Sequence, residues 1–415
     1  MPDSRSVRGL ASGPGRRPAR SGCAAIPARR ADGRSNWSIA GILTTCGILT
    51  ACGILTACGI FDATSPFDGD GSNIPPVPED SFCSIPEELV VSGGVGRDGI
   101  PALRNPSLVP SHHAEATYLG EADRVIGIEA DGRFIAVPHN ILWWHEIVNL
   151  DDFGSPIAVT YCPLTGSSMV FDRSAIEGAD LGVSGLLFHN NLMMFNRRSD
   201  GTQESLFPQM LRSARCGPLD GQPLELLPSM EMRWNAWKDL HPETLVVSGI
   251  RARGGDYEHY PYADYEVVDN GQTLFPNPEF DTRRPPKERV LGIPRDNGHG
   301  MAYPFIVLES RGDVVVVHDD VQGTQPVVVF WSSQAQAAMA YEPMVNGRDL
   351  AFEVRDSGFF DVQTGSRWTL GGRAADGPLE GSALQPVRDA YVAFWFAWAT
   401  FHPNTEVLSG PLRIS

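Results

Sequence analysis

An internal duplication is the feature that most constrains the fold of this chain. Trp237 and the segment from His241 to Gly249, His-Pro-Glu-Thr-Leu-Val-Val-Ser-Gly, are matched by Trp398 and the segment 402–410, His-Pro-Asn-Thr-Glu-Val-Leu-Ser-Gly. Earlier matches, such as Arg124-Val-Ile-Gly-Ile128 with Arg289-Val-Leu-Gly-Ile293, keep almost the same spacing. Self-similarity over such a length predicts two tandem copies of one small fold. We place copy 1 at residues 98–270 and copy 2 at residues 271–415.

Each copy is predicted to be a β-rich α+β unit, because patterns of period two dominate and helical spacing is brief. A hairpin is expected around Ala130-Asp-Gly132. The expected strands are Val125–Ile128, Arg133–Val137, Ile157–Tyr161, Ser168–Phe171 and Thr244–Ser248, and the expected helices are Asn140–Asn149, Met232–Leu240 and Ala393–Phe401.

The charge balance excludes one broad class of partner. The formal net charge is −17, whereas a protein that binds the phosphate backbone of nucleic acids needs clustered Lys and Arg. The hydrophobic fraction of 42% is that of a globular protein with sizeable cores. We therefore expect no nucleic-acid partner.

The N-terminal part resembles an export signal. An Arg-rich stretch precedes an uncharged run from Ser35 to Phe61, which is the order of the n-region and h-region. Within the run, Leu-Thr-Ala precedes Cys52 and Cys58, as in the lipobox of a bacterial lipoprotein. We interpret residues 1–58 as an export and lipidation segment and residues 59–97 as a flexible tether rich in Pro, Ser, Gly and Asp. An uncleaved membrane anchor is the alternative. Both place the body in the cell envelope, facing away from the cytoplasm.

Three cysteines remain beyond the signal segment, which is too few for a disulfide framework. A disulfide between Cys83 and Cys216 would leave Cys162 as the odd thiol.

A comparison of the two copies indicates where a site could lie. A duplicated fold keeps its core in both copies, whereas a site can survive in one. Copy 1 has the polar pairs His145-Glu146 and Tyr161-Cys162 where copy 2 has Val307-Leu-Glu309 and Trp331-Ser332. We therefore expect copy 1 to carry the site and copy 2 to be structural.

Cys162 and His145 are the central candidates. Cys162 follows a predicted strand at a turn, which would hold its thiol at an accessible rim, and Asn149 would lie on the same helical face as His145. Cys162 and His145 together with Met194 form a soft ligand set suited to copper, whereas Cys162 and His145 with a carboxylate would suit zinc.

Two alternatives from other classes stay open. In the first, Cys162 is a nucleophile with His145 as base and Asn149, or less favourably Glu146, as the orienting group; His189 is a weaker candidate. In the second, the body is a non-catalytic structural or partner-binding lipoprotein. Its acidic, tyrosine-rich strip from Tyr257 to Tyr265 could then stack on a carbohydrate or a peptide, or pack as a linker.

Several segments together resemble the bacterial family catalogued as domain of unknown function 3179, over about Asp98 to Gly410. They are Asp98-Gly-Ile-Pro-Ala-Leu-Arg-Asn-Pro106, His145-Glu-Ile-Val-Asn149, Val159-Thr-Tyr-Cys-Pro-Leu-Thr-Gly-Ser167, Gly182-Val-Ser-Gly-Leu-Leu187 and Tyr260-Pro-Tyr262. The resemblance implies an extracytoplasmic, often lipid-anchored protein with no assigned activity. Members usually carry Cys-Pro-Leu-Cys where this chain has Cys162-Pro-Leu-Thr165, and Asn where it has His189. A role that needs both thiols is therefore in doubt here.

Overall fold

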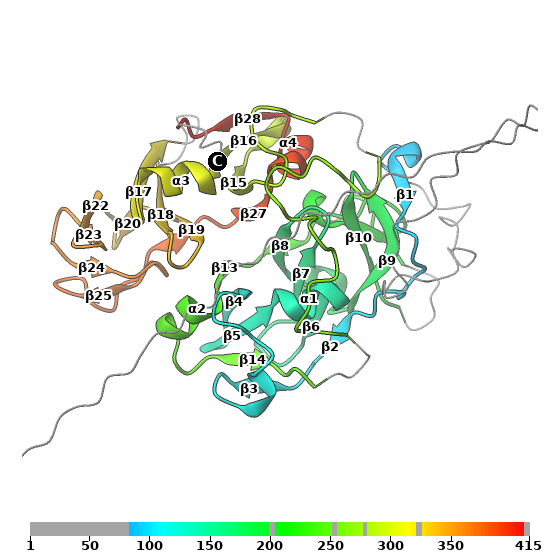
Figure 1. Ribbon diagram of the computed structural model, residues 1–415, viewed down its shortest axis with the longest axis horizontal. Coiled ribbons are helices and arrows are strands. Elements are labelled where there is room, and N and C mark those ends of the chain that lie inside the picture. The colour runs from blue at the N-terminus through cyan, green and yellow to red at the C-terminus, as the bar shows by residue number, and fades with distance from the viewer. Residues whose placement is uncertain (1–82, 199–203, 251–254, 277–279, 321–325, 411–415) are drawn as a thin grey trace, which may run out of the picture. The chain divides into compact units, whose positions relative to one another are not determined.

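Short strands make up most of the regular structure, as the alternating sequence patterns predict. The computed structural model describes residues 83–198, 204–250, 255–276, 280–320 and 326–410 (Figure 1). Within these ranges the strands form several sheets, and four α-helices accompany them. The α+β, β-rich class is thus confirmed. The helices are α1 His139–His145, α2 Trp234–Leu240, α3 Phe305–Arg311 and α4 Trp395–Phe401.

The largest sheet, called here the central sheet, has nine strands and uses residues from both predicted copies. Its order is β2-β6-β7-β8-β27-β15-β16-β28, and β12 pairs with β8. The bounds are β2 Leu103–Arg104, β6 Ile147–Leu150, β7 Ile157–Cys162, β8 Ser167–Asp172, β12 Glu225–Leu226, β15 Arg289–Pro294, β16 His299–Pro304, β27 Tyr391–Phe394 and β28 Asn404–Val407. β27 joins β8 through the pair Val392 and Ser168, so the two halves of the sheet meet there (Figure 1).

A five-stranded sheet contains the predicted hairpin. Its order is β13-β4-β5-β14-β3, with bounds β3 Leu108–Pro110, β4 Arg124–Ala130, β5 Arg133–Pro138, β13 Met230–Arg233 and β14 Leu245–Val247. The turn between β4 and β5 places Asp131 and Gly132 at positive φ, as a two-residue hairpin loop requires. The hairpin prediction is confirmed.

The pairing of β13-β4-β5-β14 recurs in the central sheet. β13 pairs antiparallel with β4, β4 antiparallel with β5, and β5 parallel with β14. The strands β27, β15, β16 and β28 pair with one another in the same order and directions.

The remaining strands form four smaller sheets. One has the order β1-β9-β10-β11, with bounds β1 Val90–Ser92, β9 Leu181–Phe188, β10 Asn191–Asn196 and β11 Leu206–Pro208. The others are β17 Val314–Asp320, β18 Pro326–Ser332, β19 Ala337–Glu342 and β26 Gln385–Pro386; β22 Phe352–Arg355, β23 Gly358–Asp361, β24 Arg367–Trp368 and β25 Ala374–Asp376; and the pair β20 Met344–Val345 and β21 Arg348–Asp349.

Helix α1 is shorter than predicted. It begins after Pro138, and it ends at His145 because Glu146 adopts a positive φ of 56°. The β-branched residues Ile147 and Val148 then continue as β6, which suits their preference for extended backbone. The predicted helix to Asn149 is therefore wrong in its last turn, and Asn149 lies on a strand.

The predicted tether also ends earlier than residue 97. Cys83 is joined to Cys216 by a disulfide, and β1 pairs with β9. Residues from Cys83 onward thus belong to the folded body. The disulfide matches the pairing considered from the sequence, and Cys162 is the free cysteine of the described residues.

Candidate functional site

A largely apolar cavity of about 450 Å³ lies beside the end of α1. Its walls come from the segment before β2, from β9 and β10, and from the tyrosine-rich segment after residue 255. The lining residues are Gly93, Gly94, Val95, Ile100, Glu146, Leu164, Val183, Gly185, Leu186, Leu187, Leu192, Tyr262, Leu274 and Phe275. Glu146 is the single residue among them with a carboxyl group.

Backbone contacts hold two of these walls together. The amide of Gly93 donates to the carbonyl of Gly185 at 2.8 Å, and the amide of Asp98 donates to the carbonyl of Val183 at 2.9 Å. Gly185 has a φ of 80°, and a Cβ there would overlap the carbonyl oxygen of Val95. Glycine is therefore required where β9 meets the N-terminal wall.

Glu146 supplies the polar end of the cavity. Its amide donates to the carbonyl of Leu142 at 2.9 Å, and its carbonyl accepts from the amide of Tyr161 at 2.9 Å, so its backbone is fixed to α1 and β7. The residue is 6% exposed, and burial raises the pKa of its carboxyl group to about 8. No ion pair joins Glu146 to any residue that the structure describes. A carboxyl group held at positive φ in an apolar cavity is typical of a functional residue.

Cys162 lies at the end of β7 and is fully buried, so the expectation of a thiol at an accessible rim is wrong. Its Sγ accepts from the amide of Leu192 at 3.4 Å. Burial and, to a lesser degree, the negative charge of Glu146 raise the pKa of the thiol to about 11. The thiol therefore stays protonated at neutral pH, whereas a nucleophile or a metal ligand has to be a thiolate.

His145 is buried and contacts two other segments. Its Nδ1 lies 2.7 Å from the carbonyl oxygen of Pro101, and its Nε2 lies 2.7 Å from the phenolic oxygen of Tyr257. These contacts connect α1 to the chain before β2 and to the tyrosine-rich segment. The direct pairing of His145 with Cys162 stays a prediction.

Asn149 has a structural role in place of the predicted one. Its Nδ2 donates to the carbonyls of Leu103 at 3.1 Å and Leu181 at 2.9 Å, and its Oδ1 accepts from the amide of Leu181 at 2.9 Å. The side chain thus joins β2, β6 and β9. Because Asn149 lies on β6, it does not share a helical face with His145.

The two remaining candidates also pack against apolar neighbours. Met194 is fully buried on β10, opposite Phe207 of β11. His189 follows β9 at a φ of 52°, and its ring contacts those of Phe188 and Phe401. Burial lowers the pKa of His189. Among the described residues, no three of His, Cys, Asp and Glu lie close enough together to hold a metal ion.

The tyrosine-rich strip packs onto the body, which is one of the alternatives that the sequence left open, and it forms one wall of the cavity, which the sequence did not predict. Tyr257 and Tyr265 are buried, and the hydroxyl of Tyr265 donates to the carbonyl of Leu164 at 2.8 Å. Tyr262 lines the cavity, and burial, followed by the charges of Glu146 and Cys162, raises the pKa of its phenol. The signal that could have located this wall is the aromatic spacing itself, since buried tyrosines are typical of a segment packed over another surface.

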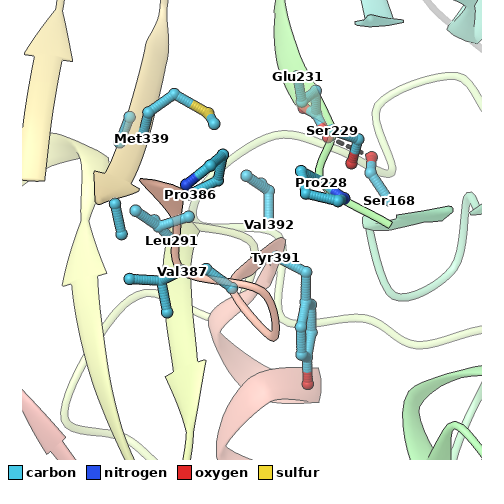
Figure 2. A pocket seen from close by; sticks show the side chains of 13 residues that line it. Ser168, Pro228, Ser229, Glu231, Leu291, Met339, Pro386, Val387, Tyr391 and Val392 are labelled. Atoms are coloured by element: carbon cyan, nitrogen blue, oxygen red, sulfur yellow. Dashed lines mark hydrogen bonds between the residues drawn. The ribbon is translucent and has the colours of Figure 1, made fainter. Parts of the chain in front are cut away.

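A second cavity, shown in Figure 2, is too small for an organic ligand. Its volume is about 20 Å³, enough for roughly one water molecule. Figure 2 shows Glu231, Ser229 and Ser168 on one side and Met339, Leu291 and Val387 on the other. The hydroxyl of Ser168 donates to the carboxylate of Glu231.

Glu231 is as buried as Glu146 but lies among cations. It is 5% exposed, and Arg289 and Arg124 approach its carboxylate at 2.6 and 3.6 Å. Burial alone would raise its pKa, but interactions with Arg289, His139 and Arg124, together with the hydrogen bond from Ser168, outweigh burial and lower it to about 2. This carboxylate is therefore charged and paired, as structural buried ions are.

The comparisons with known proteins identify one family. The family model described as Protein of unknown function (DUF3179) matches residues 97–405. No curated protein and no solved structure matches the chain. Cys52 and Cys58 lie outside the described residues, and in the part that is described no helix is long and apolar enough to cross a membrane.

Proposed function

We propose that this chain, which belongs to the Protein of unknown function (DUF3179) family, binds a small and largely apolar ligand in the cavity beside Glu146. The observation that carries the proposal is the cavity itself, with apolar walls and one carboxyl group. Its volume of about 450 Å³ lies in the usual range for ligand pockets. Apolar walls supply affinity, and a single polar group fixes the orientation of a ligand.

The position of the walls supports binding rather than a packing defect. Leu274 lines the cavity and is 51% exposed, which places a large apolar side chain at the boundary with solvent. Glu146 keeps a positive φ at a place where a glycine would avoid the strain. A void that served no purpose would not need a buried carboxyl group.

The protein is further proposed to be a lipoprotein of the cell envelope, attached to the membrane through Cys52 or Cys58. The disulfide between Cys83 and Cys216 supports an oxidising compartment. Inhibition of lipoprotein signal peptidase should accumulate a precursor, and replacement of both cysteines by Ala should release the body from membranes. A membrane fraction unchanged by both treatments would favour the uncleaved anchor.

Duplication of one small unit is also part of the proposal. Most of the ligand site, including Glu146, lies in copy 1, and copy 2 has a structural role apart from Leu274 and Phe275, which line the cavity. The recurring strand pairings support the duplication, and so do two matching tryptophan contacts. Nε1 of Trp237 donates to Oγ1 of Thr244 at 2.7 Å, and Nε1 of Trp398 donates to Oγ1 of Thr405 at 2.9 Å. In both units, the helix that carries the tryptophan ends immediately before a His-Pro pair.

A neutral fluorescent probe tests the ligand site. N-phenyl-1-naphthylamine brightens in apolar surroundings, and we expect saturable binding of about one molecule by the full chain carrying Cys52→Ala and Cys58→Ala. Val183→Trp fills the cavity from β9 and should weaken binding at least roughly tenfold, which is about 1.4 kcal/mol.

Val354→Trp is the matched control, because Val354 lies exposed on β22, outside the cavity lining. Leu187→Trp gives a second filling variant if Val183→Trp does not fold. Thermal unfolding checks the fold of each variant. Probe affinity that is equal in wild type and in folded Val183→Trp and Leu187→Trp would overturn the proposal.

A further inference from the structure

A comparison with Glu231, another buried glutamate, shows what is unusual about Glu146. Glu231 is surrounded by Arg124 and Arg289 and accepts from Ser168, so its negative charge is compensated. Glu146 is equally buried, yet neither an ion pair nor a hydrogen bond joins its carboxyl group to a described residue. Burying an uncompensated carboxylate costs several kcal/mol, so the group keeps its proton.

The groups that face Glu146 are neutral as well. Among the described residues, the thiol of Cys162 and the phenol of Tyr262 have pKa values that respond to its charge, and both pKa values are raised. The rest of the cavity lining is apolar side chains and glycines. At neutral pH the cavity therefore holds hydrogen-bond donors and no formal charge.

Such a cavity selects a neutral acceptor. A protonated carboxyl group donates one strong hydrogen bond, and an oxygen acceptor on an apolar molecule would receive it between apolar walls, where a hydrogen bond is stronger than in water. A cationic ligand would first have to drive the proton off Glu146, and an anion would find no positive charge to pair with.

We propose that the ligand is a neutral, apolar molecule with a carbonyl oxygen, such as a ketone, an aldehyde or an ester, which accepts a hydrogen bond from the protonated carboxyl group of Glu146. This inference rests on the proposed binding function and adds the chemical class of the ligand. Glu146 is fixed for the task by backbone hydrogen bonds to Leu142 and Tyr161.

Three matched naphthalenes separate the ligand classes: 2-acetylnaphthalene has the carbonyl, 2-ethylnaphthalene lacks it, and 1-(2-naphthyl)ethylamine carries an ammonium group. Their affinities for the full chain with Cys52→Ala and Cys58→Ala are measured by displacement of N-phenyl-1-naphthylamine between pH 6.5 and 9.5. Because deprotonation of Glu146 removes the donor, the affinity ratio of the acetyl to the ethyl compound should fall roughly tenfold as the pH rises through 8.

Two variants assign the effect to Glu146. Glu146→Gln keeps a donor that does not titrate, so the ratio should stay high and independent of pH. Glu146→Leu removes the donor, so the ratio should be low at every pH while the ethyl compound still binds. Far-ultraviolet circular dichroism checks that both variants fold.

The outcomes distinguish the two proposals. If the probe binds wild type and the folded Val183→Trp and Leu187→Trp variants equally, the binding function fails. If the probe binds in the cavity but none of the three compounds displaces it, the carbonyl assignment fails. If the ethyl compound binds but the ratio is constant with pH in wild type, the carbonyl assignment fails while the binding function stands. An affinity of the amine that alone rises between pH 6.5 and about 8, where its ammonium group keeps the charge, would likewise overturn the carbonyl assignment and point to a cationic ligand.

Discussion

The phenolic oxygen of Tyr257 lies 2.7 Å from Nε2 of His145, although 112 residues separate them in the chain. The other ring nitrogen of His145 lies 2.7 Å from the carbonyl oxygen of Pro101. One imidazole thus connects the chain before β2, helix α1 and the tyrosine-rich segment. Two of these segments, the chain before β2 and the tyrosine-rich segment, are walls of the cavity, and Glu146 directly follows α1, so the contact helps to position the cavity.

The hydrogen bond between Tyr257 and His145 should contribute measurably to stability. Tyr257→Phe leaves a buried imidazole nitrogen without this partner, which should cost about 1–3 kcal/mol of unfolding free energy. A double-mutant cycle with His145→Phe, measured by urea denaturation, isolates the coupling between the two side chains. We expect a coupling of about 1 kcal/mol or more. Additive effects of the two substitutions would contradict this role.

The sequence predicted the elements that depend on local pattern. The alternation around Asp131-Gly132 gave the correct hairpin, and the Trp237 and Trp398 segments both form helices that end immediately before the His of a His-Pro pair. The prediction from the sequence was wrong at the end of helix α1, where the conformation of one residue decides the boundary. Helical spacing continues from Asn140 to Asn149, and only the positive φ of Glu146, a tertiary effect, ends α1 at His145.

The raised pKa of Glu146 predicts a specific pH dependence of stability. The native carboxyl group titrates at about 8 and the unfolded one at about 4.3, so the native state holds the proton more tightly between these values. This contribution to stability is complete below the unfolded pKa and is lost as the pH rises through 8. The loss should approach about 1.4 kcal/mol per pH unit within the window.

Glu146→Gln should remove this dependence, since an amide does not titrate. The unfolding free energy of the variant minus that of wild type should therefore increase from pH 5.5 to pH 8.5, as measured by urea denaturation. Glu353→Gln is a suitable control because Glu353 is exposed on β22. A difference that does not change with pH would show that Glu146 is ionised in the native protein.

Replacement of Glu231 should destabilise the protein, because its carboxylate is charged and paired where that of Glu146 is not. Glu231→Gln leaves the partly buried Arg289 without the carboxylate that compensates it, and removal of one partner of a buried ion pair costs about 3–5 kcal/mol. Glu353→Gln breaks an exposed pair with Arg355 and should cost less than about 1 kcal/mol. Similar midpoints of urea denaturation for the two variants would argue against a structural role for this cluster.

The candidate site could be predicted only in part for a physical reason. The comparison of the copies singled out His145-Glu146 and Tyr161-Cys162, and Glu146 does lie near enough to Cys162 for its charge to raise the pKa of the thiol. The cavity itself is formed by segments far apart in the chain, from Gly93 to Phe275. No local sequence pattern predicts that these segments pack together. The burial that keeps the Cys162 thiol protonated results from this packing.

Cys162 should react slowly with alkylating reagents in the native protein. It is fully buried and its thiol pKa is about 11, so little accessible thiolate exists at pH 7.5. We expect the rate of iodoacetamide modification, followed by mass spectrometry of the Cys162 peptide from pH 5 to 9, to be at least roughly a hundredfold below that of the chain unfolded in urea.

Elemental analysis of wild type and Cys162→Ala completes this test. Copper or zinc that is present in the wild type and lost in the variant would support the soft-metal hypothesis. Rapid native alkylation with a low apparent pKa would support the thiol nucleophile. Either result would contradict a structural Cys162.

The last prediction concerns the duplication and uses two glycines at matching positions. A Cβ on Gly127 would overlap the indole ring of Trp237, and a Cβ on Gly292 would overlap that of Trp398. Because both indoles are almost fully buried, neither ring can move away cheaply. Gly127→Ala and Gly292→Ala should therefore each destabilise the protein by about 1–3 kcal/mol.

Gly271→Ala is the matched control, because nothing lies within 4 Å of a Cβ at Gly271. Thermal and urea unfolding of the three variants measure the effects. If the two units derive from one fold, each tightly packed glycine faces the same steric limit, so Gly127→Ala and Gly292→Ala should show similar losses. A tolerated alanine at either position would mean that the two tryptophan contacts are not equivalent, and the strongest structural support for the duplication would be lost.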